Sequence, residues 1–161
     1  MDISDPYHRG HSIYCWIQQG FNCFFLSSTL FLHGVCRSFE EGIFRGILFQ
    51  YLKQINLSTA IWGSAVLFGL GHAANLLSGK SIILTVAQIL FAFLFGFVAA
   101  EIVALTNSLQ WVIVWHAVHN IVDQMTSGNT PVGMQMLLLS IQCVILLVLA
   151  VVLWRRLGMK S

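Results

Sequence analysis

Long apolar stretches separated by short polar breaks dominate the sequence. A helix that spans a membrane needs about 20 largely apolar residues. On this criterion we predict membrane helices over residues 12–35, 38–53, 58–77, 82–105, 109–126 and 134–154. The fourth and the sixth stretches are the most continuously apolar. The second is short, and Glu40, Glu41 and Arg45 interrupt it.

Composition places the whole chain in a membrane. Of its 161 residues, 57% are hydrophobic and only 9% are charged. Because soluble domains carry about 25% charged residues, this composition excludes a soluble monomer. The net charge of +2 is not gathered into a basic face, which argues against nucleic-acid binding. The length predicts a single integral-membrane domain over residues 1–161, an all-α, polytopic transmembrane bundle of about six helices.

Basic residues after the last predicted helix suggest an orientation. Arg155, Arg156 and Lys160 follow that helix, and the positive-inside rule places such residues in the cytoplasm. Counting back six helices brings the N-terminus to the same side. We therefore expect both termini to be cytoplasmic.

Several ionisable or strongly polar side chains lie inside the apolar stretches. On insertion scales, a charged residue at the centre of a membrane helix costs about 2.5–3.5 kcal/mol, so function is the default hypothesis for such residues. A plain structural explanation also exists for each: an i, i+4 ion pair, a satisfied core histidine, or interhelical hydrogen bonds. They form three short motifs: Glu40-Glu41-x-x-x-Arg45, Phe68-x-x-x-His72 and His116-x-x-x-Asn120.

Counting residues along the predicted helices places the three motifs at one level of the membrane. Successive helices run antiparallel. Glu40 near the start of the second, His72 near the end of the third and Asn120 in the latter half of the fifth therefore fall in the same half of the bilayer. His116 and Asn120 are four residues apart and share a helix face. Glu101 falls on the opposite side, where we expect an interfacial or paired role.

Other residues in these helices have structural interpretations. Gly63, Gly69 and Gly71 lie in the third predicted helix, where small residues let a neighbouring helix approach closely. Asp123 lies near the end of the fifth, and we expect an interfacial role for it at the helix end. His119 overlaps the face of the third motif only partly.

Together, the three motifs resemble those of the CPBP family of intramembrane proteases, which includes the CAAX prenyl endopeptidases and the bacterial Abi proteins. That family carries EExxxR, FxxxH and then HxxxN or HxxxD, and Phe44 and Gly46 also fit its EExxFRG form. The resemblance covers a motif-bearing core over residues 36–126 and implies that Glu41 and Arg45 form a buried ion pair. Family members commonly have more membrane helices before the first motif, so we expect a short or N-terminally truncated member.

The resemblance implies hydrolysis of a peptide bond inside the membrane. Glu40 would be the general base and would activate a water molecule together with His72. His116 and Asn120 would donate hydrogen bonds to the oxyanion that forms on the scissile carbonyl. Phe68, one turn before His72, would pack against that ring and set its orientation.

A metalloprotease is the alternative mechanism within the same resemblance. Glu40, His72 and His116 would then supply a zinc site of two histidines and one carboxylate, with the fourth position open. Because Asn120 is a poor zinc ligand but a good donor to an oxyanion, we favour the metal-free mechanism and expect no cofactor.

The expected partners are membrane lipids and a peptide or protein substrate, with or without a lipid anchor. The small size is similar to that of bacterial relatives associated with bacteriocin self-immunity and peptide processing, which suggests the bacterial plasma membrane. Two other functions stay open: a non-catalytic membrane immunity or scaffold protein that retains the motifs, and a small transporter whose acidic residues and histidines relay protons. Against the transporter, the chain lacks inverted-repeat symmetry.

Overall fold

The computed structural model describes residues 38–76, 81–127 and 130–158, and these are helical with no β-strand among them. The predicted all-α fold is confirmed for these residues. The five predicted helices that fall in them are observed within a few residues of the expected bounds, whereas the first, over residues 12–35, lies outside them. The elements are η1 (Gly42–Leu48), α2 (Phe49–Lys53), α3 (Leu57–Gly71), η2 (His72–Leu76), α4 (Ile82–Thr106), α5 (Gln110–Ser127) and α6 (Val132–Gly158).

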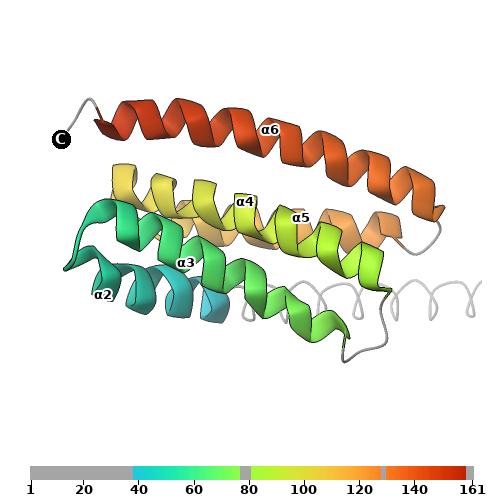
Figure 1. Ribbon diagram of the computed structural model, residues 1–161, viewed down its shortest axis with the longest axis horizontal. Helices are drawn as coiled ribbons and strands as arrows, with labels where there is room; N and C mark the ends of the chain where they lie inside the picture. Colours follow the sequence, from blue (N-terminus) through green and yellow to red (C-terminus); the bar gives the residue numbers. More distant parts are fainter. Residues whose placement is uncertain (1–37, 77–80, 128–129, 159–161) are drawn as a thin grey trace, which may run out of the picture.

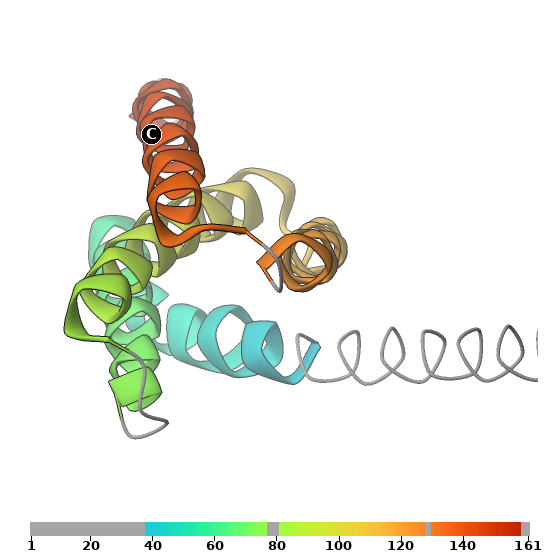
Figure 2. The same cartoon turned by 90° about the vertical axis from the view of Figure 1, so that its right-hand side faces the viewer.

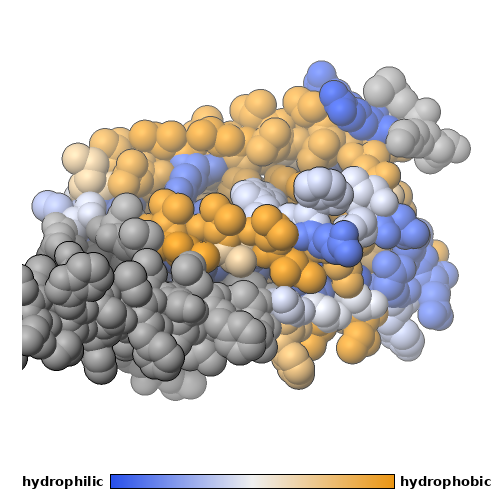
Figure 3. Space-filling model, turned by 180° about the vertical axis from the view of Figure 1, so that it is seen from behind, coloured by the Kyte–Doolittle hydropathy of each residue, from blue (hydrophilic) through white to orange (hydrophobic). Residues whose placement is uncertain are grey.

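Among the described residues, three helices are long and apolar enough to cross a membrane: α3 continued by η2, α4, and α6. The prediction of about six membrane helices is therefore supported for three. The helix over 38–53 is short and carries charged residues, and α5 carries several polar side chains, which is why neither meets that criterion. In Figure 3 an apolar surface extends along α6 at the top of the molecule, as expected for a helix that faces lipid.

The helices lie side by side, and α4 is the central one (Figures 1 and 2). It packs against α3 on one side and α6 on another, and α5 also contacts it. Because α5 returns the chain across the bundle, α4 and α6 run in the same direction (Figure 1). Residues at the start of the first described helix, at the end of α3 and in the latter half of α5 consequently line one cavity.

Polar caps determine where the helices begin and end. The side chain of Asn56 accepts a hydrogen bond from the Thr59 N–H at 2.7 Å, and that of Ser81 accepts one from the Leu84 N–H at 3.3 Å. Asn107 ends α4 in the left-handed conformation with a φ of 53°. These caps fix where α3 begins and where α4 begins and ends.

The helix that carries the first motif has π-helical backbone through η1. The N–H of Phe49, which directly follows η1, donates to the carbonyl of Phe44, five residues earlier. Segments of this kind are rare and often lie at functional sites. In η1 the π-helical turn carries the buried side chain of Arg45.

Glycines allow close helix packing at two of the three predicted positions. A Cβ atom at Gly69 would lie 3.0 Å from the Cβ of Phe93 and 3.2 Å from the carbonyl oxygen of Ile89, so α3 and α4 approach closely there. A Cβ atom at Gly63 would lie 2.7 Å from a methyl group of Leu52. The prediction is wrong for Gly71, where a Cβ atom would meet nothing within 4 Å.

We expect Gly69→Val to destabilise the protein by about 1–3 kcal/mol, the usual effect of overpacking. The atoms it would strike belong largely to the α4 backbone, so side-chain rotation cannot relieve the clash. Gly133→Val is the matched control, because Gly133 lies in α6 with nothing within 4 Å of its Cβ position. Thermal unfolding in detergent would compare the two, and equal stability of both variants would contradict close α3–α4 packing.

Candidate active site

A polar cavity of about 440 Å³ collects side chains from all three motifs. Glu40, His72, His116 and Asn120 all line it. They come from the start of the first described helix, the junction of α3 with η2, and the latter half of α5. The structure thus brings these four sequence-predicted residues to one space, as their common level in the helices suggests.

The buried centre of the site is the carboxylate of Glu41. Glu41 and Arg45 are both 0% exposed, and Nη1 of Arg45 lies 3.2 Å from Oε2 of Glu41. This is the ion pair that the sequence predicts. The structure adds a second partner, because Nδ1 of His116 lies 2.7 Å from Oε1 of Glu41. The first and third motifs are therefore joined through one carboxylate.

This contact determines how His116 faces the cavity. Since Nδ1–H donates to Glu41, the opposite nitrogen, Nε2, is directed toward Glu40. Nε2 lies 3.9 Å from Oε2 of Glu40, whose side chain is 31% exposed. That distance is longer than a direct hydrogen bond. The two groups are therefore neighbours, and both can contact a third molecule in the cavity.

The Phe68 ring and Gly96 lie close around the guanidinium of Arg45. Its Cζ atom lies 4.3 Å from the centre of the Phe68 ring, a cation–π distance. A Cβ atom at Gly96 would lie 2.8 Å from Nη2 of Arg45, so the close fit depends on glycine at this position. Sequence reasoning missed Gly96. The available signal was an isolated glycine inside a long apolar helix, which often marks close packing.

His72 is oriented by its own helix. Its Nδ1 lies 3.1 Å from the carbonyl oxygen of Phe68, to which an N–H at this position donates. In that tautomer Nε2 carries the lone pair. The rings of Phe68 and His72 are 5.2 Å apart in an edge-to-face arrangement, so the structure confirms the predicted packing of Phe68 on His72.

Asn120 is anchored to the same helix as His116. Its Nδ2 donates to the carbonyl of His116 at 3.0 Å. This bond uses one of the two N–H groups of the side-chain amide. The amide is thereby held on the cavity-facing side of α5, one turn from the His116 ring.

Aromatic rings form the wall behind His116. The Phe95 ring lies 4.8 Å from the His116 ring and stacks on Trp115 at 4.2 Å. Phe68 approaches the His116 ring from another side at 5.7 Å. Sequence reasoning did not identify Phe95, because one phenylalanine in an apolar helix carries no distinguishing signal.

His119 and Asp123 also reach the cavity. His119, which the sequence places only partly on the face of His116, lines it together with Gln142 of α6. Asp123 is exposed near the end of α5 and also lines the cavity, and its position at the membrane interface stays a prediction.

The position of Glu101 differs from the one that the sequence predicts. It is 0% exposed within α4, and neither carboxylate oxygen has a hydrogen-bond partner in the part of the chain that the structure describes. The expected interfacial or paired position is therefore wrong. Its helix is covered by neighbours along this stretch, which hydropathy counting does not reveal. Glu101 is not among the residues that line the polar cavity.

Zinc binding would require several of the candidate ligands to converge on one point. Among residues 38–76, 81–127 and 130–158, no three His, Cys, Asp or Glu side chains are placed to hold a metal ion together. Glu40, His72 and His116 share the cavity without forming such a group. We therefore derive no catalytic step through a metal.

The comparisons with known proteins agree with the motifs. Residues 19–122, more than half of the chain, match the family model described as type II CAAX prenyl endopeptidase Rce1-like. No curated protein and no solved structure matches the chain. The matched residues contain all three motifs and confirm the resemblance to the CAAX proteases. The chain is an integral membrane protein that belongs to the Rce1-like family of type II CAAX prenyl endopeptidases.

Proposed function

We propose that the protein is an intramembrane endopeptidase in which Glu40 activates a water molecule inside the polar cavity. The proposal rests mainly on the arrangement of Glu40 and His116. The partly exposed carboxylate of Glu40 lies 3.9 Å from His116, whose other ring nitrogen is bound by a buried carboxylate. This arrangement places a carboxylate that can accept a proton and a histidine that can donate a hydrogen bond beside the same space.

The reaction begins with a water molecule between Glu40 and His72. Glu40 removes a proton as the water oxygen bonds to the scissile carbonyl carbon. The negative charge that develops on the carbonyl oxygen is stabilised by hydrogen-bond donors. We assign these donors to the second N–H of Asn120 and to Nε2–H of protonated His116. The intermediate then collapses as the C–N bond breaks, and Glu40 returns its proton to the leaving amine.

The charges around the cavity suit this assignment. Arg45 balances one of the two carboxylates, Glu40 and Glu41, and the two ring nitrogens of His116 face these carboxylates. Buried charges are tolerated when they are paired and hydrogen-bonded. Because Glu41 accepts the Nδ1–H bond, a protonated His116 presents its second N–H to the cavity. Glu41 therefore acts through His116, as a positioning residue.

The membrane setting and substrate class follow from the family and from the sequence. The substrate is a peptide or protein, and we propose that it carries its scissile bond close to an apolar or lipid-linked residue. We also propose a location in a bacterial plasma membrane with both termini cytoplasmic, supported by Arg155 and Arg156 after the last helix. A role in bacteriocin self-immunity or peptide processing is part of the same proposal.

We expect Glu40→Gln to lower peptidase turnover by about 100- to 10,000-fold, because the amide keeps the shape of the side chain but removes the base. The measurement is cleavage of a quenched fluorescent peptide ending in a prenylated CAAX sequence, and of its unprenylated counterpart, in proteoliposomes. Glu101→Gln is the matched control, since it makes the same change outside the cavity and should leave turnover unchanged.

A cell-based immunity or processing assay extends this test. If Glu40→Gln retains full biological function at normal membrane levels, the protein acts by binding and the proposed hydrolysis is wrong. Loss of function at normal membrane levels is the result that hydrolysis requires.

Glu41→Leu alone should destabilise the protein by about 3–5 kcal/mol, because it leaves the Arg45 charge buried without a partner. Adding Arg45→Met should recover most of that stability, since it removes the second charge. The double variant should still lose about 10- to 100-fold in activity, because His116 has lost the acceptor that orients it. Thermal unfolding and peptide cleavage separate the two effects. Full activity of the stable double variant would show that Glu41 does not position His116.

Metal dependence distinguishes the two mechanisms that the motifs allow. We expect activity to survive exhaustive chelation, and elemental analysis of the active protein to find no stoichiometric zinc. Loss of activity on chelation, restored by added zinc, would instead assign Glu40, His72 and His116 to a metal site.

A further inference from the structure

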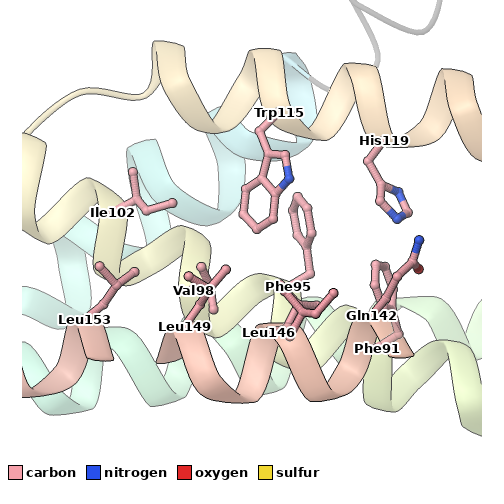
Figure 4. A pocket seen from close by; sticks show the side chains of 11 residues that line it. Phe91, Phe95, Val98, Ile102, Trp115, His119, Gln142, Leu146, Leu149 and Leu153 are labelled. Atoms are coloured by element: carbon pink, nitrogen blue, oxygen red, sulfur yellow. The ribbon is translucent and has the colours of Figure 1, made fainter. Parts of the chain in front are cut away.

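An apolar groove adjoins the polar cavity. This apolar groove has a volume of about 490 Å³ and lies between α4, α5 and α6 (Figure 4). Val98, Ile102 and Leu149 are typical of the side chains in its wall. His119 and Gln142 line both the groove and the polar cavity. They therefore lie where the two spaces meet.

These two side chains face each other from different helices. His119 projects from α5 and Gln142 from α6, and Figure 4 shows the imidazole and the amide side by side at one end of the groove. Both side chains also line the polar cavity, so the imidazole and the amide are polar groups at the same boundary. The His119 ring also stacks on Phe91, with 4.9 Å between ring centres and 24° between planes. The His119–Gln142 pair is thus a preformed polar site at the edge of an apolar surface.

The rise along α5 from His116 to His119 corresponds to between one and two residues of an extended peptide. His119 follows His116 by three residues, which places it about 4.5 Å farther along the helix axis. An extended peptide advances about 3.3 Å per residue. For a peptide that runs along α5 with its scissile carbonyl at His116, the His119–Gln142 pair lies beside the peptide group one or two residues away.

A peptide that leaves the groove for the cavity needs hydrogen-bond partners at this boundary. A peptide group in apolar surroundings without a partner costs several kcal/mol. The amide of Gln142 both donates and accepts, and so does a neutral imidazole. A bound peptide group could therefore donate to one of these two side chains and accept from the other.

We propose that His119 and Gln142 bind the main chain of the substrate on the groove side of the scissile bond. By holding one peptide group, they set which bond reaches Glu40. This inference rests on the proposed peptidase function. It makes the pair a determinant of cleavage position, distinct from the residues that carry out hydrolysis.

The test uses His119→Phe, which keeps a ring to stack on Phe91 but removes both nitrogens, and Gln142→Met, which keeps the side-chain length. With the prenylated CAAX peptide as probe, each variant should raise KM about tenfold with a much smaller change in kcat. Mass spectrometry of the products should find cleavage at additional bonds. His119→Gln should restore a single cleavage position, because it restores a donor and an acceptor. Gln135→Met, the same change elsewhere on α6, is the matched control and should behave as the wild type.

A binding measurement keeps the inference separate from catalysis. In the Glu40→Gln background the same peptide should bind about ten times more weakly when His119→Phe or Gln142→Met is added. If the wild type does not cleave the peptide, the proposed function fails for this substrate, and the binding comparison still decides the role of the pair. Unchanged affinity in both double variants, or a single unchanged cleavage position with unchanged KM in both active variants, would overturn the inference.

Discussion

The buried carboxylate of Glu41 is the contact on which the site depends. It binds Arg45 on its own helix and His116 on α5, two residues that are 71 positions apart in the chain. A carboxylate that is 0% exposed is stable only with such partners. The Glu41–His116 contact thereby joins the helix of the first motif to α5 and fixes their relative position along the bundle. The same contact turns Nε2 of His116 toward Glu40. One carboxylate therefore both holds two helices together and orients a candidate catalytic group.

The packing of α4 makes this arrangement possible. Gly96 leaves room for the Arg45 guanidinium, and Phe95, on the same helix, supports the His116 ring. The central helix therefore shapes the cavity from behind, although it supplies none of the motif residues. Beyond this wall, the polar space gives way to the apolar groove at His119 and Gln142. A substrate that crosses this boundary moves from lipid-like surroundings to hydrogen-bonding ones, which is what peptide hydrolysis in a membrane requires.

Much of this organisation could be predicted from the sequence. Apolar length predicts the described helices, and antiparallel order predicts that Glu40, His72 and Asn120 lie at one level, since both follow from simple geometry. Helix counting does not give rotation about each helix axis, so it left open which carboxylate contacts His116. It also gave the wrong position for Glu101, which is buried and not interfacial, because burial depends on neighbouring helices that the local pattern does not specify. The π-helical turn of η1 likewise has no signal in residue spacing.

The most direct test of the central claim is a structure with a non-cleavable peptide whose scissile amide is replaced by a hydroxyl-bearing, transition-state-like group. The hydroxyl would stand in for the attacking water and the oxyanion. If Glu40 is the base, the hydroxyl group should lie within hydrogen-bond distance of the Glu40 carboxylate. Nε2 of His116 should lie beside the hydroxyl group, and Nδ1 should still be bound to Glu41. A peptide seated elsewhere, or a hydroxyl group out of reach of Glu40, would contradict the claim.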